Sequence, residues 1–270
     1  MKKTLLFFLL ILIFTSCKSQ KTIDFKVGYL PNFNYTLLQK NISENNITYN
    51  GSKDFLQRLE NNGIENPTIT KDSSLLKSIS KTGKLDGNNF PIEIELLESN
   101  NPTLNPGTKF YAKSIDGVTK IDSIYSSTMT EAKKRILLST MESMMNQIKY
   151  PNKKMKVGES FEQNNPMTMP IGDVTIVIDI SSIYTLNKIS NGIGYFELDQ
   201  VYKIKSATKD YEMKLDGTGK GQVEFDIKKQ FFTKYYSEME MDLTTNLEEF
   251  GIELQTKTIT EQTTEIKARS

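Results

Sequence analysis

The sequence predicts an α+β domain in which a predominantly antiparallel, strongly curved β-sheet, an open or partial barrel, packs on one long helix. Many segments alternate apolar and polar residues, as half-buried strands do. Short turns between these segments leave no room for crossover helices. Only two segments have helical spacing, a long one near residues 130–148 and a short one near 52–62.

Alternation is clearest in the C-terminal half. From Val174 to Ile180, every second residue is apolar, which predicts a half-buried strand. The same pattern recurs at residues 196–204, 211–215, 223–227 and 239–243, and more weakly at 33–42, 75–85, 91–97, 109–115 and 118–125. The connections predicted between the C-terminal strands are Asn191-Gly192, Asp216-Gly217 and residues 228–230. These connections are typical of an antiparallel meander.

Capping and stop signals define the two helices. Residues 128–131 (Thr-Met-Thr-Glu) form a capping box, and Pro151 stops the long helix that follows. The short helix is expected to begin after Ser52 and to end at Gly63. The long helix lies in the segment 128–150, which joins two halves of one domain. These halves are about 27–127 and 151–270, so that 27–270 is a single β-rich domain.

The apolar stripe of the long helix is rich in methionine. We interpret the stripe as a candidate ligand cavity lined by Leu137, Met141, Met144, Met145 and Ile148. Further methionines, among them Met213, Met239 and Met241, fall on predicted strands. The alternative is that these side chains only fill the core.

The N-terminus has the features of a bacterial lipoprotein signal. Lys2 and Lys3 precede an apolar run, residues 5–14, which is too short to span a bilayer. Thr15 and Ser16 lead to Cys17, the single cysteine of the chain. We therefore expect a signal peptide over 1–16, lipidation at Cys17 and a tether over 17–26.

The residues after Cys17 indicate a location. No aspartate follows the cysteine, which disfavours retention in the inner membrane. No acidic cluster follows either, which disfavours exposure on the cell surface. The expected location is the outer membrane, with the domain held by its lipid and facing the periplasm.

Composition excludes several kinds of chemistry. Histidine is absent and the one cysteine is assigned to the anchor, so Ser/His/Asp triads, Cys/His dyads and Cys/His zinc sites cannot form. The formal net charge of +1 gives no attraction for nucleic acid. We expect no enzyme, cofactor or metal. Carboxylate pairs such as Glu93 with Glu95, or Glu248 with Glu249, leave a hydrolase as a third choice.

Two short motifs carry a resemblance to a group of proteins. Residues 156–161 (Lys-Val-Gly-Glu-Ser-Phe) and 219–226 (Gly-Lys-Gly-Gln-Val-Glu-Phe-Asp) resemble those of uncharacterised bacterial lipoproteins of the Bacteroidetes type. Glu159 stands where that group has aspartate more often, and Phe161 where it has tryptophan. The architecture that this resemblance implies is similar to the periplasmic lipoprotein-carrier half-barrel. It implies no catalytic residue or ligand.

These observations predict a lipoprotein that contacts the membrane through its anchor. Its leading function is to bind an apolar ligand or an envelope protein. The alternative is a structural or protein-interaction domain with a filled core.

Overall fold

The computed structural model describes residues 22–102, 104–147, 150–171, 174–207, 212–246 and 249–269. The predicted signal peptide, Cys17 and residues 17–21 of the predicted tether lie outside the described residues. The next residues of the predicted tether do not form a free linker, because Thr22–Phe25 are a strand and Ile23 and Phe25 are buried. Within the described residues, no helix has the length and apolar character needed to cross a membrane.

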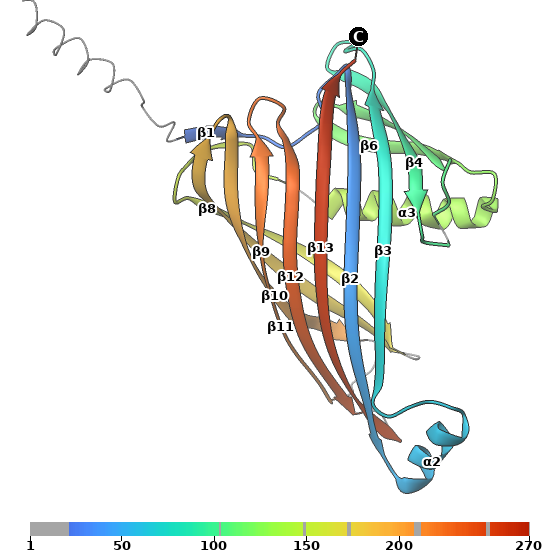
Figure 1. Cartoon of the computed structure of the whole chain (residues 1–270). Coiled ribbons are helices and arrows are strands. Elements are labelled where there is room, and N and C mark those ends of the chain that lie inside the picture. The colour runs from blue at the N-terminus through green and yellow to red at the C-terminus, as the bar shows by residue number, and fades with distance from the viewer. Residues whose placement is uncertain are drawn as a thin grey trace, which may run out of the picture.

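One antiparallel sheet of 11 strands makes up most of the molecule (Figure 1). Its order is β6-β5-β4-β3-β2-β13-β12-β11-β10-β9-β8, so β6 and β8 are its edges and the sheet is not closed. Pairing of β2 with β13 joins the first and last of these strands in the chain. The bounds are β2 Phe33–Gly51, β3 Thr68–Thr82, β4 Asn89–Ser99, β5 Lys109–Ile115, β6 Val118–Tyr125, β8 Ser160–Ile171, β9 Val174–Ser190, β10 Ile193–Ala207, β11 Glu212–Asp226, β12 Phe231–Asn246 and β13 Phe250–Ala268.

The prediction of an α+β domain packed on a long helix is wrong. The chain is about 69 % strand and 10 % helix. Helix α3 (Glu131–Gln147) does not support the curved sheet as a layer, because the side chains that are described as packed meet the cluster centred on β4, β5 and β6 at one edge. Elsewhere the long strands curve and pack their own side chains together, which removes the need for a helical layer.

The short helix α2 (Lys53–Asn61) connects β2 to β3, at the end of the sheet opposite the C-terminus of the chain (Figure 1). Its predicted cap is confirmed, because the Ser52 hydroxyl accepts a hydrogen bond from the backbone nitrogen of Phe55. In α3 the cap lies later than the capping box predicted. The Thr130 hydroxyl accepts from the backbone nitrogen of Lys133, and the helix begins at Glu131.

The strand predictions at 109–115 and 118–125 agree with β5 and β6 at both ends. The turn predicted at Asp216-Gly217 is wrong, because both residues lie inside β11. Glycine there serves close packing rather than chain reversal. A Cβ at Gly217 would lie 2.9 Å from the Cβ of Tyr202 on the neighbouring strand, so the glycine makes room for that ring.

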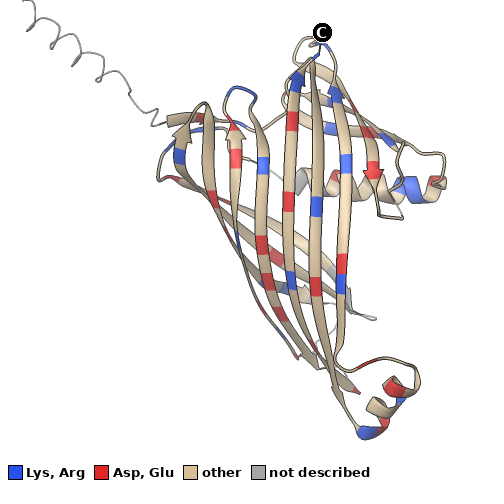
Figure 2. Ribbon diagram, in the orientation of Figure 1, with Lys and Arg blue, Asp and Glu red and all other residues tan. Residues whose placement is uncertain are grey.

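Strand alternation and register divide the side chains of the sheet between two faces. We call the face that carries the buried clusters the inner face, and the other the outer face. Among the described residues, Asp72 on β3 is the one charged side chain at an inner position of the sheet. Charged residues are frequent along the strands (Figure 2), and the register places the others on the outer face.

Part of the inner face is covered by a second, small sheet. Strands β1 (Thr22–Phe25) and β7 (Lys153–Lys156) pair with each other and bury Ile23, Phe25 and Met155 against β8 to β12. The middle of the inner face, on β2, β3 and β13, consists mainly of half-buried side chains.

Candidate functional site

The inner face has an apolar half on β8 to β12. Its buried members are Ile176, Ile178, Tyr202, Met241 and Leu243. Half-buried apolar side chains surround them, namely Met167, Ile180, Ile204, Met213, Leu215, Met239 and Leu254. The strand methionines singled out in the sequence therefore lie together. Such long, soft side chains adapt to irregular apolar shapes.

The other half of the inner face is mostly polar, and among the described residues Asp72 is its one charged side chain. Its side chains come from β2, β3 and β13 and bond across the strands. The Asn41 amide donates to the Ser74 hydroxyl at 2.9 Å, and the Ser43 and Thr258 hydroxyls lie 3.0 Å apart. Half-buried amides and hydroxyls continue the pattern at Gln39, Asn45, Thr256, Thr260 and Gln262. Apart from Asp72, this surface offers neutral groups that can exchange hydrogen bonds.

Several inner polar atoms are buried without a hydrogen-bond partner among the described residues. They include Gln163 Nε2, Thr245 Oγ1 and Thr264 Oγ1. Gln163 is 5 % exposed and stands opposite Ser182, whose hydroxyl already accepts a hydrogen bond from Gln200 at 3.0 Å. A buried polar group without a partner is destabilising, and such groups are few in native proteins.

Buried tyrosines occupy the boundary between the apolar clusters. Burial raises the pKa of Tyr150 and of Tyr202 to about 12. Burial also raises the pKa of Tyr184, and the nearby phenols of Tyr150, Tyr235 and Tyr202 raise it further. These hydroxyls therefore stay protonated and can donate hydrogen bonds over the physiological range.

Alkaline pH is expected to destabilise the domain through these tyrosines. An acid whose pKa is raised from 10.0 to about 12 on folding stabilises the protein fully below about pH 10, and this contribution is lost as the pH rises towards 12. Thermal unfolding between about pH 8 and pH 11 should show a falling Tm. Tyr202→Phe should flatten this slope, whereas an equal slope in the variant and the parent protein would contradict the assignment.

The helix residues predicted to line a cavity lie apart from the strand methionines. Leu137, Met141 and Met145 are half-buried against the cluster that includes Phe90 and Phe110. Nothing is described for the side chain of Met144, and Ile148 lies outside the described residues. The helix-lined cavity stays a prediction.

The predicted carboxylate pair Glu93 and Glu95 lies on the outer face of β4. Glu93 is 3.2 Å from the Lys109 Nζ, and Glu95 is 3.3 Å from the Lys81 Nζ. These carboxylates therefore belong to an ion-pair network. Glu248 lies outside the described residues. In the described part of the chain, no group of three or more acidic, histidine or cysteine residues could hold a metal ion.

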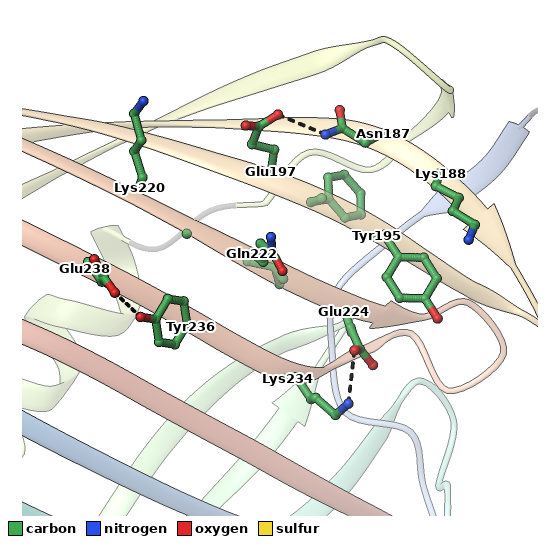
Figure 3. Close-up of a pocket in the computed structure, with 13 residues that line it drawn as sticks. Asn187, Lys188, Tyr195, Glu197, Lys220, Gln222, Glu224, Lys234, Tyr236 and Glu238 are labelled. Carbon is green, nitrogen blue, oxygen red and sulfur yellow. Dashed lines mark hydrogen bonds and ion pairs between the residues drawn. The ribbon is translucent and has the colours of Figure 1, made fainter.

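A pocket of about 730 Å³ lies on the outer face of β9 to β12 (Figure 3). This pocket was not predicted from the sequence, because its residues come from four strands that only the fold brings together. In cross-strand register, Glu197, Gln222 and Tyr236 form one row, and Tyr195, Glu224 and Lys234 form the next. Gln222 thus lies between the two tyrosines (Figure 3).

Two β-bulges flank this pocket. One lies at Tyr195/Phe196 and the other at Glu224/Phe225. A bulge increases the local twist of a strand pair, and this twist can hollow a sheet surface that would otherwise be flat. The extra residue at the first bulge, Asn187, donates a hydrogen bond to Glu197 at 2.9 Å inside the pocket.

Comparisons with known proteins leave the chain without a family. No protein-family profile and no curated protein matches it. The solved structures to which the chain has a distant similarity include the following two. A domain described as an outer membrane lipoprotein-sorting protein from Vibrio parahaemolyticus has 10 % identity, a TM-score of 0.19 and 86 % coverage of both chains. Ail, the attachment invasion locus protein of Yersinia pestis, has 4 % identity, a TM-score of 0.15 and coverage of 86 % of this chain and 99 % of Ail. Scores this low assign neither fold nor function.

Proposed function

We propose that this protein is a lipoprotein, anchored to the outer membrane through Cys17 and facing the periplasm, whose domain binds an uncharged amphipathic component of the envelope. The observation that carries the proposal is the inner face of the sheet. Among the described residues its one charged side chain is Asp72, which is exposed, whereas the outer face is rich in charge. Charged side chains on a binding face would have to lose water when an apolar ligand arrives, which is unfavourable.

The two halves of the inner face suit the two parts of such a ligand. The half with Met167, Met213 and Met239 offers apolar contact to a chain or ring system. The half on β2 and β13 offers hydroxyls and amides to an uncharged polar group. Gln163, buried on the edge strand β8 of the apolar half, offers a donor that has no hydrogen-bond partner among the described residues. The ligand would thus be held by contact area first and oriented by a few hydrogen bonds.

A pair of lysine substitutions on β13 tests the proposal. Thr258→Lys places a charge on the inner face, and Thr263→Lys places the same charge at an outer, exposed position of the same strand. Uptake of a neutral fluorescent dye, Nile red, is measured with residues 18–270 purified without detergent. We expect Thr258→Lys to weaken binding about tenfold or more, because the lysine must be desolvated, and Thr263→Lys to leave it unchanged.

Equal dye binding by both variants would contradict the inner face as the site. The absence of binding by the parent domain, with the fold intact, would favour the alternative of a structural or protein-interaction domain with a filled core.

A further inference from the structure

We propose that the outer-face pocket on β9 to β12 is a second binding site, which takes a neutral carbohydrate chain. It lies on the opposite side of the sheet from the inner face and does not depend on the function proposed for that face. The comparisons give this pocket no role. Its two tyrosines, its hydrogen-bonding groups and its balanced charge support the proposal.

The tyrosines stand at positions where the strand pattern normally places polar residues. Tyr195 on β10 and Tyr236 on β12 both project from the outer face, and β11 runs between them. Because one strand lies between them, β10 and β12 are roughly 10 Å apart. The two rings therefore mark the ends of an elongated site. Aromatic faces on a wet surface pack well against the C–H groups on the faces of sugar rings, which are apolar while the ring edges carry hydroxyls.

Each tyrosine is held by a neighbour. Lys188 lies over the Tyr195 ring, with its Nζ 5.7 Å from the ring centroid. The Tyr236 hydroxyl donates a hydrogen bond to the carboxylate of Glu238. These contacts fix the rings before a ligand arrives and so lower the entropy lost on binding.

The floor between the rings carries groups that pair with hydroxyls. Glu197 and Gln222 are cross-strand partners on β10 and β11, and the row continues to Tyr236. A carboxylate accepts from two adjacent hydroxyls, and an amide both donates and accepts. Neighbouring hydroxyls on a sugar ring both donate and accept hydrogen bonds, so they pair with both donors and acceptors.

The charge balance argues for a neutral ligand. Three lysines and three glutamates line the pocket: Lys188, Lys220, Lys234, Glu197, Glu224 and Glu238. Lys234 pairs with Glu224 at 3.0 Å, so part of this charge is already neutralised. A site for phosphate or for another polyanion would show an excess of lysine or arginine. The volume of about 730 Å³ lies within the usual range for small-molecule sites.

The test uses the full chain in detergent and a panel of neutral gluco-, manno- and N-acetylglucosamine oligosaccharides, with binding measured by calorimetry. We expect at least one class to bind, and Tyr195→Ala and Tyr236→Ala each to weaken that binding about tenfold or more. Tyr236→Phe, which keeps the ring but loses the hydroxyl, should retain most of it. The matched control is Tyr111→Ala on β5, where the tyrosine is 40 % exposed outside the pocket, and no change is expected there.

Two outcomes would overturn the proposal. One is that none of the oligosaccharides binds the folded parent chain. The other is that Tyr111→Ala weakens binding as much as the pocket variants do. Circular dichroism of each variant separates a loss of binding from a loss of fold. Thr258→Lys on the inner face should leave oligosaccharide binding unchanged. The proposal for the inner face and the proposal for the outer-face pocket are therefore tested independently.

Discussion

Replacing Phe25 with alanine is expected to lower the free energy of unfolding by about 3–5 kcal/mol. Phe25 lies on the short strand β1, is 0 % exposed, and is surrounded by rings from several strands of the large sheet. Its ring centroid lies 4.9 Å from those of Phe161 and Phe225 and 5.3 Å from that of Phe196. Removing the ring leaves a cavity that the surrounding strands cannot easily close, because each is held in register by its neighbours.

Urea unfolding monitored by circular dichroism measures this loss. The matched control is Asp24→Ala, because Asp24 is the adjacent, exposed residue of the same strand. A change at Asp24 should stay within about 0.5 kcal/mol. If Phe25→Ala cost less than about 1 kcal/mol, β1 would not be an integral part of the core.

Gly221→Ala is expected to destabilise the domain by about 2–3 kcal/mol or more, through overpacking. A Cβ at Gly221 would overlap the backbone carbonyl oxygen of Tyr236 on the paired strand, and the Cα of Ser237 would lie 3.1 Å away. Backbone atoms in a paired strand cannot move aside as a flexible side chain can. The substitution would therefore have to displace β12 from β11, in the part of the sheet that carries the outer-face pocket.

Gly28→Ala is the control for this second prediction. No atom lies within 4 Å of a Cβ built at Gly28, and its backbone needs no positive φ, so its stability should change little. Equal Tm values for the two variants would contradict the close approach of β11 and β12. We also expect Gly221→Ala to weaken oligosaccharide binding, since Gly221 lines the pocket.

Local pattern predicts most of the strands, because alternation reflects which side of a strand meets water. It predicts neither the order of the strands nor how far they extend. Pairing of Phe33–Gly51 with Phe250–Ala268 joins residues that are 199 to 235 positions apart in the sequence, and no local signal encodes that partner. The helical layer was predicted wrongly because an apolar stripe on a helix shows that the helix is partly buried, and not how much of the sheet it covers.

The candidate sites also depend on strand pairing, which local sequence patterns do not reveal. Strand alternation indicated that Met213, Met239 and Met241 face one side, yet only the cross-strand register gathers them into one cluster. The outer-face pocket left a weaker signal, namely a tyrosine at positions 195 and 236, where alternation places polar residues. From sequence alone, these two isolated aromatic residues could not be placed in one site.

The central claim is that the inner face holds an uncharged amphipathic ligand. The most direct test is mass spectrometry of residues 18–270, secreted without the anchor and purified without detergent, under native and denaturing conditions. We expect a stoichiometric added mass that is present in the native spectrum, is lost on denaturation and is strongly reduced by Thr258→Lys but not by Thr263→Lys. A native mass equal to that of the bare chain, together with no uptake of added neutral lipid, would contradict it.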